Sequence, residues 1–284
     1  MTPRLACADF SFPLLPHRLA LTLIADLGFE GVDIGLFGGG AQLSPETMLA
    51  NTHRSARELS KQIEDSGLLL ADVFLIPGSF DVLAANHPDA AERSKSRDLF
   101  SRCLEFVRSC EGSHMTALPG IPWKGESAET SLLRASEELA WRVEQASTAS
   151  VIFSIEPHLE SVVETPEAAI ALLRRTPGLT LTLDYTHFTY QGIPDSRIEA
   201  LVPHASHFHA RGATADRLQA AMKQNVIDYP RVLRAMDRAN YQGFVGVEYC
   251  WDEWKRSNEV DVLSETILMR DLLRSAASNI PGKV

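Results

Sequence analysis

Four side chains of the kind that bind divalent metals recur in the second half of the sequence. They are Glu156, Asp184, His209 and Glu248, and each closes a short run of apolar residues and threonines typical of a buried strand. Ionised carboxylates buried together repel one another and lose their hydration, so such a set needs a cation at neutral pH. Three carboxylates and one imidazole form an oxygen-rich set of ligands. The residues therefore predict one bound divalent ion, Mn²⁺, Mg²⁺ or Co²⁺, with Zn²⁺ as a further alternative.

Eight short apolar segments could position these side chains. They alternate with longer stretches in which apolar residues recur at helical spacing. The predicted strands cover residues 5–10, 31–37, 68–76, 114–120, 151–158, 179–188, 205–210 and 243–250. Eight βα units of about 35 residues predict an α/β protein, a (β/α)8 TIM barrel that forms one domain over residues 1–284. A doubly wound sheet is less favoured, because the glycine cluster at 38–40 follows the second strand and lacks the GxGxxG spacing.

Alternation along the predicted strands indicates which side chains face the inside of the barrel. In LTLTLD (179–184) the leucines share one parity, which leaves the two threonines and Asp184 for the interior. Glu156, His209 and Glu248 fall on the face assigned to the interior in their own strands. Functional residues of such barrels lie at the C-terminal ends of the strands. We therefore expect all four side chains to meet at one end of the barrel, with the metal site built by strands five to eight.

Composition narrows the classes of partner. The chain has 284 residues, with 27 basic against 37 acidic residues and a formal net charge of -10, and it contains no basic run that would neutralise phosphates. We expect no nucleic acid and no membrane among its partners. Its four cysteines are scattered without a CxxC pair, and the N-terminal segment is interrupted by charges. Both features predict a cytoplasmic protein with reduced thiols.

Several motifs resemble a known family. IEPH (155–158), LDYTHF (183–188), HFHAR (207–211) and GFVGVEY (243–249) are similar to the sugar phosphate isomerase/epimerase branch of the xylose isomerase-like TIM barrels. GFEGVDIGLFGG (28–39) also resembles an early pattern of that family. The resemblance implies one divalent ion held by the four side chains named above, with His187 facing the substrate. It also implies a homo-dimer or homo-tetramer.

Further side chains are candidates for contact with a sugar-like substrate. Arg211 shares the parity of His209 and could reach a substrate oxygen beyond the metal, and Arg217 is the competing arginine. His158 is the last residue of the fifth predicted strand, one residue past Pro157. Trp123, Trp251 and Trp254 fall in the loops after strands four and eight, where an aromatic face could pack on a sugar ring. We expect a structural role for His114, and for His207 a place in the barrel core or behind the metal ligands. Asp33 matches an acidic position of the family pattern, and the alternative is a place in a buried hydrogen-bond network.

These residues suggest a mechanism. Glu156 and Glu248 come from strands five and eight, so they could face opposite sides of a hydroxyketone held by the metal. One would take a proton from the carbon beside the carbonyl and the other would return one, through an enediolate, while His187 hydrogen-bonds the developing oxyanion. This predicts a metal-dependent enzyme of carbohydrate metabolism, an isomerase or epimerase acting on a small ketose or related hydroxycarbonyl.

Three alternatives share much of this pattern. A metal-dependent lyase could use the same ligands, either as an inosose or dehydroshikimate dehydratase or as a deglycosidase that eliminates an aglycone. A relative of the apurinic endonucleases would need more histidines in the first half, and strands 68–76 and 114–120 end without one. A non-catalytic, metal-stabilised subunit is the third. Glu160 and Glu164 do not fall at the spacing that ketose epimerases use for a further substrate-binding glutamate, which leaves the substrate open.

Overall fold

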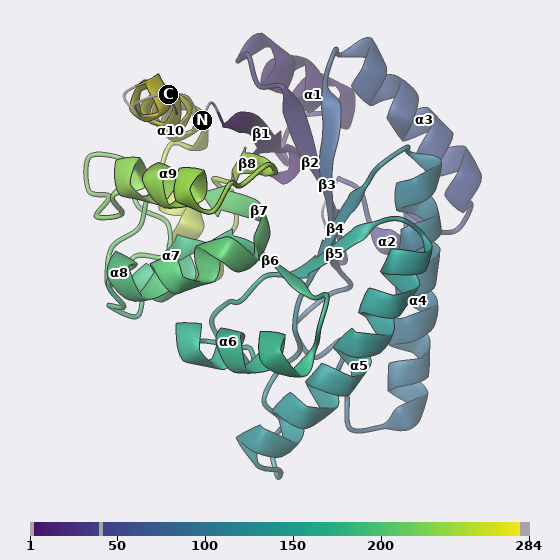
Figure 1. Ribbon diagram of the computed structural model, residues 1–284. Coiled ribbons are helices and arrows are strands. Elements are labelled where there is room, and N and C mark those ends of the chain that lie inside the picture. The colour runs from purple at the N-terminus through teal and green to yellow at the C-terminus, as the bar shows by residue number, and fades with distance from the viewer. Residues whose placement is uncertain (1–2, 40–41, 279–284) are drawn as a thin grey trace.

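The strands of this protein close into one parallel barrel. The computed structural model describes residues 3–39 and 42–278. The strands are β1 (Arg4–Ala8), β2 (Gly31–Phe37), β3 (Leu69–Ile76), β4 (His114–Ala117), β5 (Ile152–Ile155), β6 (Thr180–Asp184), β7 (Ala205–Ala210) and β8 (Phe244–Val247). They follow one another around the barrel in chain order, and β8 pairs with β1 to close it (Figure 1). The predicted α/β class and single-domain TIM barrel are confirmed, and β2 and β7 have the predicted bounds.

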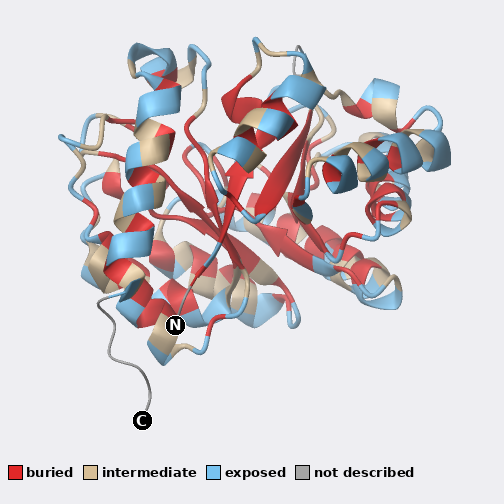
Figure 2. Cartoon of the chain, turned by 90° about the horizontal axis from the view of Figure 1, so that it is seen from above, coloured by how far each residue is buried: buried red, intermediate tan, exposed pale blue. Residues whose placement is uncertain are grey.

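Helices surround the barrel. They are α1 (His17–Asp26), α2 (Pro45–Met48), α3 (Thr52–Asp65), α4 (Ala90–Ser109), α5 (Ala128–Thr148), α6 (Pro166–Arg175), α7 (Tyr185–Thr189), α8 (Asp195–Ile198), α9 (Tyr229–Arg238) and α10 (Val262–Ser278), with 3-10 turns at η1 (Asp9–Ser11), η2 (Glu199–His204) and η3 (Trp254–Glu259). Figure 2 shows buried strands at the centre and helices whose outer faces are exposed. Many helices begin at a side chain that accepts a backbone N–H bond, as Asn51, Ser127 and Thr165 do.

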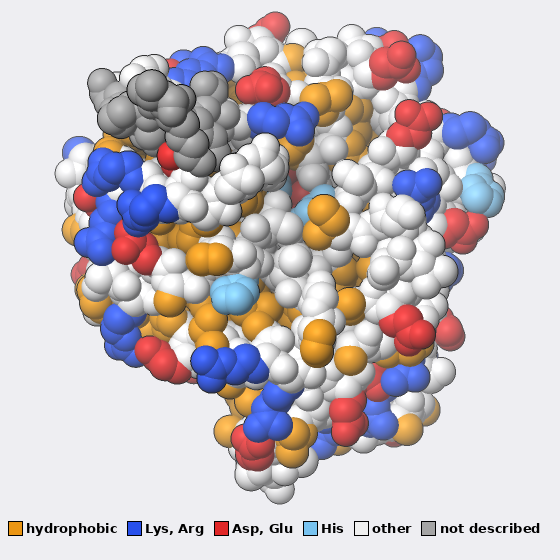
Figure 3. All heavy atoms as spheres, in the orientation of Figure 1, with side chains coloured by type: hydrophobic (Ala, Val, Ile, Leu, Met, Phe, Trp, Pro, Cys, Tyr) orange, Lys and Arg blue, Asp and Glu red, His pale blue; other side chains and the backbone are white. Residues whose placement is uncertain are grey.

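The surface carries both signs of charge. On the face shown in Figure 3, acidic and basic side chains are interspersed around the outline, and hydrophobic side chains gather nearer the middle. Within residues 3–39 and 42–278, none of the helices combines the length and the apolar character needed to cross a bilayer.

The interior of the barrel is partly polar, as strand parity predicted. Thr116, Ser154 and Thr182 meet inside it, with their hydroxyl oxygens 2.6 to 3.1 Å apart. Below them, at the N-terminal end, His114 contacts Asp72 through Nδ1 at 2.7 Å and Ser206 through Nε2 at 2.8 Å. These bonds tie β3, β4 and β7 together through buried side chains, which confirms the structural role expected for His114.

Several predicted strands ran past the observed C-terminal ends, namely 5–10, 114–120, 151–158, 179–188 and 243–250, and the error over 179–188 affects the site. The sequence predicted a strand over 179–188, but β6 ends at Asp184 and residues Tyr185–Thr189 form the short helix α7. Asp184 caps this helix, because its Oδ1 accepts the backbone N–H of Thr186 at 2.8 Å. Asp184 and His187 are therefore one helical turn apart and point to the same side, where an extended strand would have placed them on opposite faces.

Candidate active site

The four predicted metal ligands converge at the C-terminal end of the barrel. Asp184 ends β6 and His209 lies in β7, whereas Glu156 and Glu248 directly follow β5 and β8. All four side chains are buried. The ligand atoms of Glu156, His209 and Glu248 lie within 4.8 Å of one another, and a second set of the same compactness joins Glu156, Asp184 and His187. The predicted convergence is thus present in the fold.

His209 lies between the two glutamates. Its Nδ1 is 2.7 Å from Oε1 of Glu156 and 3.4 Å from Oε2 of Glu248. Burial opposes a charge on this ring, but Glu248 and Glu156 outweigh burial and raise the pKa of His209 to about 10. Burial raises the pKa of Glu248 to about 7. The two glutamates therefore favour a positive charge at Nδ1 of His209, which a proton or a metal ion could supply.

Asp184 and His187 form the second part of the site. His187 Nε2 lies 3.6 Å from Oδ2 of Asp184 and 3.9 Å from Oε2 of Glu156. Its Nδ1 accepts the backbone N–H of Leu159 at 3.4 Å, so a neutral ring carries its proton on Nε2, toward the carboxylates. Burial lowers the pKa of His187 to about 4, and the ring is therefore neutral near pH 7. A neutral imidazole can donate this proton in a hydrogen bond without adding charge to the site.

Arg211 enters the site and Arg217 does not. The Arg211 Nη2 atom lies 3.0 Å from Oδ2 of Asp184 and 3.7 Å from Oε2 of Glu248. Its backbone is fixed by Tyr229, whose hydroxyl contacts both the N–H and the C=O of Arg211. Arg217 pairs with Glu259 in a partly exposed position outside the cavity described below. Of the two arginines left open by the sequence, Arg211 is the one that can reach substrate.

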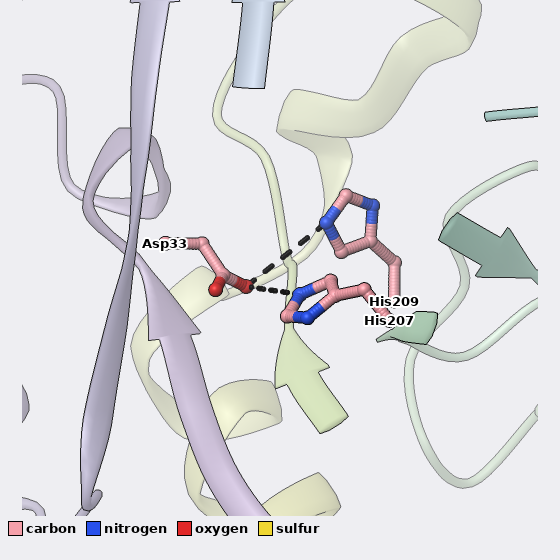
Figure 4. A group of neighbouring side chains, drawn as sticks. All are labelled: Asp33, His207 and His209. Atoms are coloured by element: carbon pink, nitrogen blue, oxygen red, sulfur yellow. Dashed lines mark hydrogen bonds and ion pairs between the residues drawn. The ribbon is translucent and has the colours of Figure 1, made fainter. Parts of the chain in front are cut away.

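Behind His209 lies a fourth acidic side chain. Asp33 of β2 reaches across the barrel, and its Oδ2 lies 3.1 Å from Nε2 of His207 and 4.0 Å from Nε2 of His209 (Figure 4). Asp33 and both histidines are buried. Asp33 therefore faces the ring nitrogen of His209 that points away from Glu156 and Glu248. A carboxylate in this position orients a metal-binding imidazole.

The chemistry of the side chains fits a divalent ion. Oε2 of Glu248 is buried and makes no hydrogen bond, although Nδ1 of His209 and Nη2 of Arg211 lie 3.4 and 3.7 Å away. Ion pairs at these distances leave the oxygen without a hydrogen-bond donor, and a metal ion bound directly to it would remove that cost. Glu156, Asp184, His209 and Glu248 would hold the ion, and their hard ligand atoms suit Mn²⁺, Mg²⁺ or Co²⁺.

A cavity of about 550 Å³ opens onto Glu156 and Glu248, with Asp184 and His209 buried behind its lining. Its polar lining also includes His158, His187 and Arg211. Both ring nitrogens of His158 are buried without a hydrogen-bond partner, and its ring lies 4.7 Å from that of Phe80. The site therefore combines candidate metal ligands, a neutral imidazole and a space of the size that small-molecule ligands occupy.

Comparison with known proteins agrees with this architecture. The model of the xylose isomerase-like TIM barrel family matches residues 21–272. The chain belongs to this family.

Solved structures with the same fold have low sequence identity. D-psicose 3-epimerase from Clostridium cellulolyticum, solved with D-tagatose, has a TM-score of 0.77 at 14% identity, over 96% of this chain and 99% of that chain. The 3-keto-D-glucoside 4-epimerase from E. coli has a TM-score of 0.73 at 14% identity, over 96% and 99%. An AP endonuclease of family 2 from Brucella melitensis has a TM-score of 0.73 at 17% identity, over 95% of this chain and 98% of that chain. No curated protein sequence matches the chain.

Two of the three predicted tryptophan contacts lie outside the cavity of this xylose isomerase-like barrel. Trp123 donates its indole N–H to Oδ1 of Asn86 and packs against His87, so it stabilises the loop after β4. Trp251 is 46% exposed and borders a neighbouring hollow. Trp254, the third, lines the cavity, with its ring 5.6 Å from Phe80 and 6.2 Å from His187.

Aromatic lining residues were missed by sequence reasoning. Phe10, Phe37, Phe74 and Phe80 all border the cavity. Three of them fall in predicted strands, near the C-terminal ends where functional side chains gather in this family's barrels. That position was an available signal, but a phenylalanine at a strand end has the same sequence pattern as a core residue.

Proposed function

We propose that this protein is a divalent-metal-dependent sugar isomerase or epimerase that acts on a ketose or related hydroxycarbonyl compound. The observation that carries the proposal is the buried set of Glu156, His209 and Glu248 beside Asp184 and a neutral His187, with Glu156, His187 and Glu248 lining one cavity. The names of the solved relatives point the same way, because they include a D-psicose 3-epimerase and a 3-keto-D-glucoside 4-epimerase.

Glu156 and Glu248 would carry out the two proton transfers of the reaction. Glu156 and Glu248 flank Nδ1 of His209 from β5 and β8, so a substrate between them presents a different side to each carboxylate. Glu248 borders the cavity and its Oε2 makes no hydrogen bond, so its carboxylate is placed to exchange a proton with a bound substrate. When bound, the metal ion supplies Lewis-acid polarisation of the substrate carbonyl.

Two further side chains would stabilise the charge that develops on oxygen. His187 presents its Nε2 proton toward the carboxylates, where the carbonyl oxygen of a substrate would lie. Arg211, held by Tyr229, adds a fixed positive charge. Return of the proton to the same carbon from the opposite side gives epimerisation, and its transfer to the neighbouring carbon gives isomerisation.

Metal removal provides the first test. We expect the protein as purified or after repletion with Mn²⁺ to bind about one ion per chain, and a chelator to remove activity on a panel of ketoses while the protein stays folded. Glu156→Gln and Asp184→Asn should both lose the ion. Glu167→Gln, which alters an exposed glutamate paired with Arg197, is the matched control and should keep it.

Elemental analysis, circular dichroism and product analysis would be read together. A wild-type protein that binds no ion after repletion would contradict the proposal. An unsaturated product in place of an epimer or isomer would instead identify a lyase built on the same ligands.

A further inference from the structure

The mouth of the barrel is divided into a charged half and an apolar half. Strands β5 to β8 supply the carboxylates, the imidazoles and Arg211. Strands β1 to β4 and the residues just after them supply an apolar surface, the apolar wall, made of Phe10, Phe37, Phe74, Ile76 and Leu118. Both halves line the same cavity.

The apolar wall is a separate cluster and not an extension of the main core. Ala8, Phe10 and Phe74 form a buried cluster of their own, against which Phe37, Ile76 and Leu118 pack. Phe37, Ile76 and Leu118 are only partly buried, and part of their surface faces the cavity. The wall therefore presents aromatic and aliphatic surface to whatever the cavity binds.

The aromatic rings of the wall form a series of contacts that ends at His209, a candidate metal ligand. Ring centroids are 4.6 Å apart for Phe10 and Phe37, 5.5 Å for Phe37 and Phe74, and 5.7 Å for Phe74 and His209. A ligand bound beside His209 would therefore also contact the apolar wall. Sugar hydroxyl groups placed against this wall would lose their hydrogen bonds to water without gaining others.

The size of the cavity also exceeds the needs of one sugar ring. A dry protein cavity of about 150 Å³ holds a six-membered ring the size of benzene. This cavity measures about 550 Å³, which leaves room for a second group beside a sugar bound at the carboxylates.

Three aromatic rings, those of Phe80, His158 and Trp254, also line the cavity and would enclose a second group of the ligand. Phe80, His158 and Trp254 pack ring against ring, and Lys255 next to Trp254 reaches Glu160 at 2.9 Å. This ion pair joins the segment after β8 to the segment after β5. The pair is partly exposed and contributes little, so the ring contacts with Phe80 and His187 are what place Trp254 over the cavity.

From this division we infer that the substrate is a hydroxyketo sugar that carries an aromatic substituent, as in an oxidised aryl glycoside. The sugar part would lie at Glu156, His209 and Glu248, and the aromatic part would lie against the apolar wall. The inference rests on the proposed function, and it narrows the substrate from ketoses in general to glycosides with an aromatic aglycone.

Two unreactive glycosides test the inference. Phenyl β-D-glucopyranoside and methyl β-D-glucopyranoside share the sugar, lack the carbonyl and differ in the aromatic group. We expect the Mn²⁺-loaded protein to bind the phenyl glycoside about 10- to 100-fold more tightly by isothermal titration calorimetry, because burial of a phenyl-sized group has that effect on affinity. Phe37→Ala should reduce this preference several-fold. Val226→Ala, at an exposed position outside the cavity, should retain it.

The outcomes separate this inference from the proposed function. Equal affinity for the two glycosides, or no binding of either, would overturn the inference, while turnover of free ketoses in the panel described above would still support an isomerase or epimerase. If Phe37→Ala fails to fold, Ile76→Ala tests the same wall. A preference for the phenyl glycoside that survives both substitutions would also overturn it, because the wall would then not be the binding surface.

Discussion

Glu248→Gln is expected to lower kcat by about 10²- to 10⁴-fold, the range that a positioned acid or base supplies. Glutamine keeps the shape of the side chain but can neither take up a proton from carbon nor return one. The substitution also removes a charge beside His209, whose Nδ1 lies 3.4 Å from Glu248, so metal affinity should fall as well. Steady-state kinetics at saturating Mn²⁺ would measure the first effect and a metal titration the second.

Another glutamate of the same cavity provides the control. Glu160 lines the cavity but is 53% exposed and pairs with Lys255, away from the candidate metal ligands. Glu160→Gln should change kcat by less than about tenfold, since pairs this exposed contribute little. Turnover by Glu248→Gln within tenfold of wild type, with the metal bound, would exclude Glu248 as a proton-transfer group.

The ligands could be predicted from sequence because barrel geometry repeats. Each strand of a (β/α)8 barrel contributes its C-terminal end to the same face, so Glu156, Asp184, His209 and Glu248 needed only strand assignment and parity to be placed together. The same reasoning failed over 185–188, where the chain turns into α7. The Asp184 side chain caps that helix through Thr186, and an aspartate two residues before a threonine was the local signal that could have indicated the turn.

The lining of the cavity depended on contacts that no local pattern encodes. The indole N–H of Trp123 donates a hydrogen bond to Asn86, 37 residues away in the chain, and this bond keeps the ring out of the cavity. Phe37 and Phe74 have the pattern of buried strand residues. Only the closed barrel shows that both border a cavity and that Phe37 remains partly exposed. Parity identifies the inward face of a strand, but it does not say whether other side chains fill the space in front of it.

Gly246→Ala is expected to lower the free energy of unfolding by about 3 kcal/mol and to weaken metal binding. Gly246 lies in β8 beside His209 of β7, and its missing side chain leaves space inside the barrel. A Cβ atom there would lie 1.9 Å from Oδ2 of Asp33 and 3.2 Å from Nε2 of His207. The backbone of Gly246 is not in the left-handed region, so the cost would come from this collision alone.

The collision would be hard to relieve, because the carboxylate of Asp33 is fully buried and lies 3.1 Å from Nε2 of His207. Any shift of Asp33 breaks that contact and moves the charge that faces His209, the imidazole proposed to bind metal. A double-mutant cycle separates this cause from general crowding of the barrel. Asp33→Ala removes the colliding oxygen, so Gly246→Ala should destabilise the Asp33→Ala protein by much less than it destabilises the wild type. Equal destabilisation in both backgrounds, measured by urea unfolding, would show that Asp33 is not what requires glycine at this position.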